Sequence, residues 1–405
     1  MSKPSGNRRL RVLMVADVSP VQRAGGSARV IKEQTIRLVA RHHSLELLCR
    51  HPLEEVAPRE ELAGAALIHY PVNRSNPLSY AASSILGARK LFDRLLSDET
   101  RDVVVFHQPF SSWGSLSVGA RVPSCVYMFY SPSGIEYGLR RPSKSTGQPR
   151  IGARIVGRLM TLMERRVLDR CSRVIVLSAF SRRVLEQMHG TTHRNVVTIP
   201  GGVDLEHFSP AIDRQSVRQQ LGISPDQIVF LTVRDLEPRM GIDNFLRALA
   251  SLSTKRKLGI IGGSGPLSDQ LRKQVRQEGL ENAVRFVGHI PEEQLPLYYQ
   301  AADLFVLPTR AHEGFGLVTV EALACGTPVV ATPVGATPEI LVRLEPGLLS
   351  ENTSAEAIAE AMRRALSFAS TLEFRRHCRD YIERQYNWER HIDRFEAELL
   401  SVCLS

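Results

Sequence analysis

Residues 303–324 read DLFVLPTRAHEGFGLVTVEALA, and this stretch decides the fold class. Residues 303–307 form a strand-like apolar run, and residues 318–324 have the apolar spacing of a helix. Gly314 and Gly316 lie between them, as expected of a tight turn. A strand that turns at glycine into a helix presents unpaired backbone N–H groups and the positive end of the helix dipole to one site. The stretch therefore predicts α/β architecture with an anion-binding site at this turn.

Two glutamates flank the predicted anion site. Glu313 lies in the loop, and Glu321 lies about one turn into the helix. Carboxylates accept hydrogen bonds from hydroxyl groups. A nucleotide-sugar fits a site of this kind: its phosphates would lie between the two acceptors, with the sugar on one side and the ribose on the other. The short glutamate–glycine motif is weak evidence by itself, because glycine turns before helices are common.

The surrounding sequence resembles glycosyltransferase family 4. The spacing of eight positions between Glu313 and Glu321 matches the glutamate pair of that family, and residues 322–339, ALACGTPVVATPVGATPE, match it as well. The resemblance extends from about Arg11 to Leu400. It implies the GT-B fold, an α/β architecture of two Rossmann-like domains whose parallel sheets face a central cleft.

The same resemblance implies that the two domains bind different substrates. Residues 1–200 are expected to form an acceptor-binding domain, and residues 201–385 a nucleotide-sugar-binding domain. The last helix, within residues 386–405, is expected to pack back on the first domain. The Gly- and Pro-rich segment 200–210 has the composition of a boundary loop between the two.

Apolar runs alternate with helical patterns along the chain, as in parallel α/β proteins. The expected strands are residues 12–16, 45–49, 103–106, 125–129, 174–177, 196–199, 228–233, 257–261, 284–287, 304–307 and 328–331. Clear helical patterns cover residues 28–41, 79–96 and 155–171.

Composition narrows the class of protein. A chain of 405 residues is too long for one core and most simply forms two domains. The six cysteines are scattered without a C-x-x-C pair, which favours reduced thiols over disulfides or a zinc site. No apolar run approaches the roughly 18 residues that span a bilayer, and the N-terminus lacks an apolar signal segment. These features predict a cytoplasmic protein, with peripheral contact at the inner face of the membrane as an open alternative.

The charge is uneven along the chain. The first 200 residues hold 30 Lys and Arg against 15 Asp and Glu, whereas the remainder holds 22 against 27. This asymmetry indicates an anionic partner for the first half, although a solvated basic surface explains it equally well. Nucleic acid is not expected as that partner, because aromatic residues are sparse and no recognition module is visible.

Two candidate sites belong to the first half. Gly25 and Gly26 follow the first expected strand, where paired glycines let the backbone approach a phosphate. The resemblance implies that this loop binds the donor pyrophosphate; an ordinary turn is the alternative. His107 ends the expected strand 103–106, and the resemblance implies a catalytic position near the transferred bond. A neutral imidazole hydrogen-bonds a sugar hydroxyl, whereas a protonated one balances negative charge.

The sequence departs from its apparent family at the phosphate-binding basic pair. Many members carry Gly-Arg-Leu, three further residues and then Lys-Gly, but here Asp235 and Met240 occupy the arginine and lysine positions. Arg234 and Arg239 each lie one residue upstream. We expect Arg239 to contact phosphate and Asp235 to orient an arginine; a weakened site is the alternative.

The implied donor-binding residues come from several loops. The glycine loop 262–265 does not match the dinucleotide-binding motif, so NAD is not expected, and in the family this loop lines the nucleotide pocket. The full donor-binding set is Gly25, Gly26, Arg234, Arg239, Gly265, Gly314, Phe315, Gly316, Leu317, Val318 and Glu321. No Asp-x-Asp ends a strand, and the resemblance implies a reaction that needs no metal. Neither a metal nor another cofactor is therefore expected beside the nucleotide-sugar.

One helical pattern carries a basic face. Arg154, Arg158 and Arg165 share a face, and Ile151, Ile155, Leu159 and Leu162 form a neighbouring apolar stripe. This pattern fits docking on anionic lipid headgroups. It also fits a helix that buries its apolar stripe in the core and solvates its arginines.

The sequence thus predicts a retaining glycosyltransferase that needs no metal, with His107 and Glu313 as its catalytic residues. The acceptor is expected to be a hydroxyl of a glycan, a lipid-linked molecule or a small molecule. Two alternatives stay open: a GT-B nucleotide-sugar epimerase, and a non-catalytic binding protein related to glycosyltransferases. No pyridoxal-phosphate segment is recognisable, which disfavours a phosphorylase.

Overall fold

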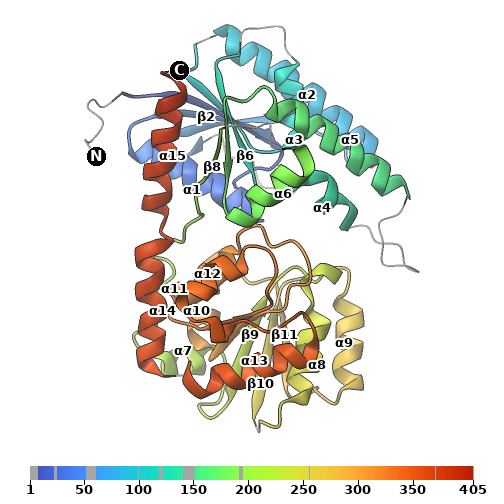
Figure 1. Ribbon diagram of the computed structural model, residues 1–405, viewed down its shortest axis with the longest axis vertical. Helices are drawn as coiled ribbons and strands as arrows, with labels where there is room; N and C mark the ends of the chain where they lie inside the picture. Colours follow the sequence, from blue (N-terminus) through green and yellow to red (C-terminus); the bar gives the residue numbers. More distant parts are fainter. Residues whose placement is uncertain are drawn as a thin grey trace. The chain divides into compact units, whose positions relative to one another are not determined.

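The structure is a computed structural model that describes residues 8–21, 25–51, 61–98, 100–117, 122–139, 151–190, 195–254, 256–369 and 371–404. The chain forms two compact units (Figure 1). The first unit contains Met1–Pro200 and His391–Ser405, and the second contains Gly201–Arg390.

The first unit is built on a sheet of eight strands within the described residues. In spatial order these are β3 (Glu61–Leu62), β4 (Ala65–Tyr70), β2 (Ser44–Arg50), β1 (Arg11–Ala16), β5 (Val103–Phe106), β6 (Ser124–Phe129), β7 (Arg173–Val176) and β8 (Val196–Thr198). All neighbours pair in parallel except β3, which runs antiparallel to β4. Its central strands are buried on both faces, as parallel strands covered by helices must be.

Helices cover the first sheet (Figure 1). They are α1 (Gly26–Ala40), α2 (Pro77–Asp98), α3 (Pro109–Leu116), α4 (Ser133–Leu139), α5 (Ile151–Leu168) and α6 (Ala179–His189). Helix α3 packs between α2 and α5, and α4 packs on α5.

The second unit has a parallel sheet of five strands in the part of the chain described. In spatial order these are β11 (Val284–Gly288), β10 (Lys257–Gly262), β9 (Ile228–Val233), β12 (Leu304–Leu307) and β13 (Val329–Ala331). Its helices are α7 (Arg214–Gln220), α8 (Ile242–Ser251), α9 (Ser268–Gln277), α10 (Leu295–Ala301), α11 (Leu317–Ala324), α12 (Thr337–Leu344), α13 (Ala355–Phe368) and α14 (Leu372–Gln385). Short 3-10 turns occupy Pro238–Met240, Glu292–Gln294 and Pro346–Leu348.

The last helix, α15 (Trp388–Val402), returns to the first unit from His391 onward. The Nδ1 atom of His391 lies 2.7 Å from the Pro200 carbonyl oxygen. Further along the helix, Glu396 accepts hydrogen bonds from Arg41 at 2.7 Å and from His43 at 2.8 Å. These contacts tie α15 to the C-terminal end of α1 and to the loop that follows it.

The predicted α/β class is confirmed, and every predicted strand is present with ends within one residue of the expected ones. The sequence interpretation missed β3 and β4. Strand β4 reads AALIHY, in which Ile68 is the one β-branched residue, so its strand propensity is weak. Pairing with β2 along five residues fixes it in the sheet instead. Within the described residues, no helix combines the length and apolar character needed to cross a bilayer.

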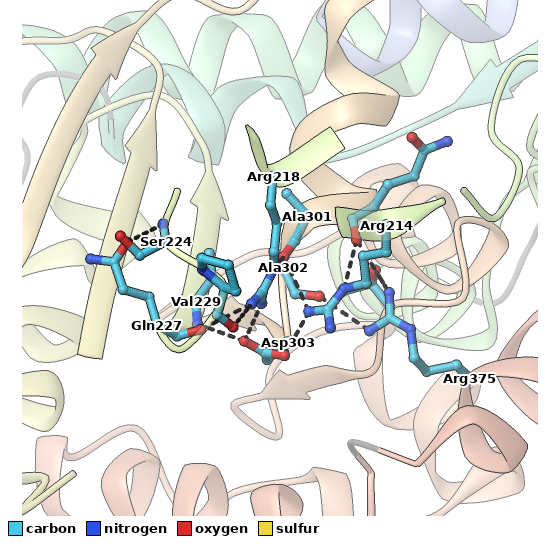
Figure 2. A network of polar contacts seen from close by, with 12 residues as sticks. Arg214, Arg218, Ser224, Gln227, Val229, Ala301, Ala302, Asp303 and Arg375 are labelled. Carbon is cyan, nitrogen blue, oxygen red and sulfur yellow. Dashed lines mark hydrogen bonds and ion pairs between the residues drawn. The ribbon is translucent and has the colours of Figure 1, made fainter. Parts of the chain in front are cut away.

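A partly buried ionic network holds the amino-terminal edge of the second sheet (Figure 2). Asp303, just before β12, accepts hydrogen bonds from Arg214 and Arg218, both at 2.6 Å, and from the backbone N–H of Val229 at 2.7 Å. Arg375 of α14 donates to the Ala302 carbonyl oxygen at 3.1 Å, and burial lowers its pKa to about 10. The network joins α7, β9, the start of β12 and α14. These arginines therefore stabilise the packing of the second unit.

We expect Asp303→Ala to reduce the free energy of unfolding by about 3–5 kcal/mol, because it leaves two partly buried guanidinium groups without their carboxylate. Glu360→Ala is the matched control, since its pair with Arg363 is exposed on both sides. That change should cost less than about 1 kcal/mol. Urea unfolding followed by circular dichroism measures both, and equal losses would contradict a structural role for Asp303.

Candidate functional site

Loops at the carboxyl edge of the second sheet form the candidate site. They follow β9, β10, β12 and β13, the positions where ligands bind in open parallel sheets. The predicted strand, turn and helix are present as β12, the loop 308–316 and α11. Gly316 is the N-cap of α11 in the left-handed conformation, with φ 87°, and provides no side chain to cap the helix. The Thr319 N–H donates to the Gly316 carbonyl oxygen at 2.9 Å, which leaves the N–H groups of Leu317 and Val318 available to an anion.

Glu313 is held in this loop by backbone and side-chain contacts. Its carbonyl oxygen accepts a hydrogen bond from the Ala336 N–H at 2.8 Å, which ties the loop to the segment after β13. Its carboxylate accepts hydrogen bonds from Arg234 at 2.6 Å and from Thr309 at 3.4 Å. The side chain is largely buried, and its position is fixed before any ligand binds.

Two glycines allow this loop to touch its neighbours. A Cβ at Gly335 would lie 2.2 Å from the Glu313 carbonyl oxygen, and a Cβ at Gly241 would lie 1.9 Å from that of Pro308. Both glycines also have positive φ, at 68° and 70°. No other residue fits either place without moving the backbone of the loop 308–316.

Glu321 lies within α11 and is 1% exposed. It accepts a hydrogen bond from the Tyr299 hydroxyl at 3.0 Å, which joins α11 to α10. Its assignment to the ribose stays a prediction, and in this structure the carboxylate has a defined structural partner.

Gly265 has a clear packing role. A Cβ there would lie 2.6 Å from the Leu236 carbonyl oxygen and 2.7 Å from the Leu236 nitrogen. The Leu236 N–H donates to the Ser264 carbonyl oxygen at 2.9 Å. Gly265 therefore lets the loop after β10 lie against the loop after β9, where Arg234 is located.

In the first unit, His107 follows β5 and is 1% exposed. Its Nδ1 lies 2.7 Å from the Tyr130 hydroxyl, and Nε2 is buried without a hydrogen-bond partner. Burial lowers the pKa of His107 to about 3, so the imidazole is neutral near pH 7. A neutral imidazole fits the first of the two roles considered for this histidine, which is hydrogen bonding to a sugar hydroxyl.

The glycine pair lies in the same unit. Gly25 is the N-cap of α1, and Gly26 is its first residue, two positions before the expected start. A Cβ at Gly25 would meet nothing within 4 Å, so the space beside it is open. Gly25 therefore leaves room for a ligand to approach the start of α1.

Sequence reasoning missed Asp17, which follows β1 in the first unit. Its carboxylate accepts hydrogen bonds from the N–H groups of Phe110 and Ser111, at 3.0 and 2.8 Å, and from the Tyr70 hydroxyl at 3.1 Å. Burial raises the pKa of Asp17, while these hydrogen bonds oppose the rise. The position directly after the first strand was the available signal. Asp17 caps α3 and so fixes the start of the segment that follows His107.

Comparisons with known proteins match this arrangement. The family described as "Glycosyltransferase Family 4" matches residues 24–207, and "Glycosyl transferases group 1" matches residues 213–385. The chain belongs to glycosyltransferase family 4.

Several relatives in this family are similar along the chain. D-inositol 3-phosphate glycosyltransferase of Saccharomonospora viridis is 27% identical over 412 residues, which covers 95% of this chain and 92% of the relative. The enzyme of that name from Geodermatophilus obscurus is 31% identical over 263 residues, or 62% of this chain and 56% of the relative. The match to a third, from Catenulispora acidiphila, covers 44% of that relative. The chain thus spans about half the length of the first curated relatives it matches.

Solved structures show the fold. Sucrose-phosphate synthase from Thermosynechococcus elongatus has a TM-score of 0.82 at 22% identity, covering 98% of this chain and 100% of that one. HepE of Anabaena, in complex with UDP and glucose, has a TM-score of 0.74 at 18% identity, covering 97% of this chain and 100% of that one. The GT-B fold predicted from the sequence is confirmed.

The departures from the family pattern now have a structural description. Met240, at the lysine position, is 5% exposed. Asp235, at the arginine position, is exposed, and its carboxylate has no hydrogen bond or ion pair within the described residues. The expectation that Asp235 orients an arginine is therefore wrong. Glu237 instead lies near an arginine, with its Oε2 atom 3.4 Å from Nε of Arg239, but these two atoms form no hydrogen bond.

Within the described residues, no group of three His, Cys, Asp or Glu side chains is placed to hold a metal ion. The candidate site offers cationic side chains, backbone N–H groups and carboxylates. This chemistry suits a phosphate and hydroxyl groups.

We expect Gly335→Ala to destabilise the protein more than Gly222→Ala does. Both glycines have positive φ, 68° and 62°, but a Cβ at Gly222 meets nothing within 4 Å. The control thus isolates the conformational cost of about 1–2 kcal/mol, while Gly335→Ala adds displacement of Glu313. Urea unfolding gives both values, and equal losses would show that the contact with Glu313 is not restrictive.

Proposed function

We propose that this protein is a glycosyltransferase that moves a sugar from a nucleotide diphosphate to a hydroxyl group of an acceptor. The observation that carries the proposal is the placement of Glu313. Its carboxylate lies in the turn before α11, 2.6 Å from the Arg234 guanidinium. A carboxylate for sugar hydroxyls, a cation and free helix N–H groups therefore meet in one loop cluster.

The proposed mechanism is electrostatic. The N–H groups at the start of α11 and an arginine stabilise the departing diphosphate, as preorganised donors do for developing negative charge. Glu313 accepts hydrogen bonds from the sugar hydroxyls, and Glu321 accepts them from the ribose. His107, as a neutral imidazole, forms a hydrogen bond with a sugar hydroxyl. Transfer proceeds with retention by attack on the same face, so no carboxylate nucleophile is required. Neither a metal nor another cofactor takes part in this proposal.

The comparisons support the substrate classes. HepE is described in complex with UDP and glucose, and a relative from Mycolicibacterium smegmatis is named a GDP-mannose-dependent mannosyltransferase. That relative is 27% identical over 363 residues, covering 87% of this chain and 88% of its own length. A further HepE structure is described in complex with UDP-glucose, so a nucleotide-sugar appears in the descriptions of both proteins. The acceptor is a glycan, a lipid-linked molecule or a small molecule such as an inositol phosphate.

The test begins with UDP-, GDP- and ADP-sugars in a thermal stabilisation screen, because a ligand that binds the native state raises the melting temperature. Transfer from the stabilising donor to an inositol phosphate or a lipid-linked glycan follows, with and without a chelator. Glu321→Ala should mainly raise KM, and Glu313→Ala should mainly lower kcat, since the second contact is assigned to the transition state. Donor binding without transfer or hydrolysis would favour the non-catalytic alternative, and full activity in both variants would reject the glutamate roles.

We also propose that the first unit contacts anionic membrane through α5. The apolar stripe of this helix was open to interpretation as core, but Ile155, Leu159 and Leu162 are 56%, 49% and 57% exposed. Arg154, Arg158 and Arg165 are exposed on the same helix. Ile135, on the neighbouring α4, is exposed as well, whereas the side chain of Ile151 lies outside the described residues. Apolar side chains framed by arginines suit the interface of a bilayer with anionic headgroups.

Replacing Arg154, Arg158 and Arg165 by Gln should weaken binding to anionic vesicles by about two decades at low salt, at roughly 1 kcal/mol per arginine. The matched control replaces three exposed cations of α9, Arg272, Lys273 and Arg276, and should bind like wild type. Co-sedimentation with phosphatidylglycerol vesicles measures both, and binding should fade at a few hundred millimolar salt. Equal sedimentation of both triple variants would contradict the proposal that α5 contacts the membrane.

A further inference from the structure

The arginines near the candidate site differ in what they contact. Arg310 donates to Asp243 at 2.5 Å and to Asn244 at 2.8 Å. Arg239 donates to the His312 carbonyl oxygen at 3.1 Å, and its Nε lies near Glu237. Both guanidinium groups thus have partners other than Glu313, although the Nε of Arg239 is buried without a hydrogen bond.

Arg234 is paired differently. Its carboxylate partner is Glu313, the residue assigned to the donor sugar, and the two side chains are 8% and 11% exposed. The pair joins residues 79 positions apart, across the loops after β9 and β12. While it is closed, one oxygen of Glu313 is taken by the guanidinium, and this oxygen is not available to a sugar hydroxyl.

The guanidinium of Arg234 is also incompletely bonded. Its Nε is buried without a hydrogen-bond partner, and Nη2 lies 2.9 Å from the sulfur of Met240, which is a weak acceptor. A buried donor without an acceptor is costly. A ligand with several anionic oxygens would satisfy these donors, and a diphosphate has that chemistry.

Met240 brings no second cation to the neighbourhood of the Arg234–Glu313 pair. The usual lysine position holds an uncharged side chain in contact with Arg234, and the usual arginine position holds the exposed Asp235. The positive charge is therefore supplied from position 234, six residues before the lysine position.

We infer that Arg234 is the cation that binds the donor diphosphate, and that binding transfers this guanidinium from Glu313 to the phosphate oxygens. The inference rests on the proposed function. The diphosphate thereby frees the Glu313 carboxylate to accept hydrogen bonds from the sugar. In the absence of donor, the pair keeps both charges neutralised in a largely buried place.

A measurable consequence separates this exchange from simple sugar binding by Glu313. Binding of a nucleoside diphosphate without a sugar must break the Arg234–Glu313 pair and gains nothing from Glu313. Glu313→Gln should therefore tighten nucleoside diphosphate binding by about tenfold, because the guanidinium no longer has a charged competitor. Arg234→Met should weaken it by at least about tenfold in either background.

The experiment is calorimetric titration of the full chain with UDP, GDP, ADP and inorganic pyrophosphate. Glu237→Gln is the matched control, because it releases Arg239 from its carboxylate as Glu313→Gln releases Arg234. It should leave the affinity unchanged. Arg234→Lys keeps the charge but loses the planar fork, so it should recover part of the affinity and guards against misfolding of Arg234→Met.

The outcomes distinguish this inference from the proposed function. Tighter binding in Glu313→Gln together with weaker binding in Arg234→Met supports the exchange. Wild-type binding with no gain in Glu313→Gln, or a gain in Glu237→Gln instead, overturns the exchange and leaves the transferase proposal standing. Absence of binding by wild type to all four probes would overturn both.

Discussion

Backbone contact between loops is the constraint on which the second unit's site depends. Gly241 lies against the Pro308 carbonyl and Gly335 against the Glu313 carbonyl, at distances that leave no room for a Cβ. These contacts lock the loop 308–316 between the segments that follow β9 and β13. The left-handed Gly316 then starts α11 at the end of that loop. Because the backbone is fixed at both sides, the Glu313 carboxylate is positioned by packing before a ligand is present.

Charge compensation differs between the two edges of the sheet in this unit. At the amino-terminal edge of the sheet, Asp303 receives hydrogen bonds from two arginines and a backbone N–H group, so its charge is compensated within the fold. At the carboxyl edge, Arg234 has one carboxylate partner and a buried Nε with none. An incompletely satisfied cation beside free helix N–H groups is a place where an anionic ligand lowers the free energy.

The sequence predicted the fold well, because strands buried on both faces are short apolar runs and their periodicity is local. Strand β4 was not predicted, because its residues have weak strand propensity and tertiary pairing with β2 decides its conformation. The turn at Glu313 was predicted from glycines alone. The Arg234–Glu313 pair was not, because nothing local relates residues 79 positions apart. Periodicity found the apolar stripe of α5 but could not tell whether another element covers it.

At the phosphate-binding motif, this chain lacks the usual lysine but places an arginine side chain beside the same loop. A lysine replaced by Met240 would read as a lost phosphate ligand if positions were compared one by one. In three dimensions, the sulfur of Met240 lies beside Arg234, and a guanidinium occupies the space next to Glu313. A planar guanidinium reaches a carboxylate and a phosphate with different N–H groups, which a lysine does only as a point charge. In the exchange that we infer, this cation links the two parts of one donor, its diphosphate and its sugar, through a single side chain.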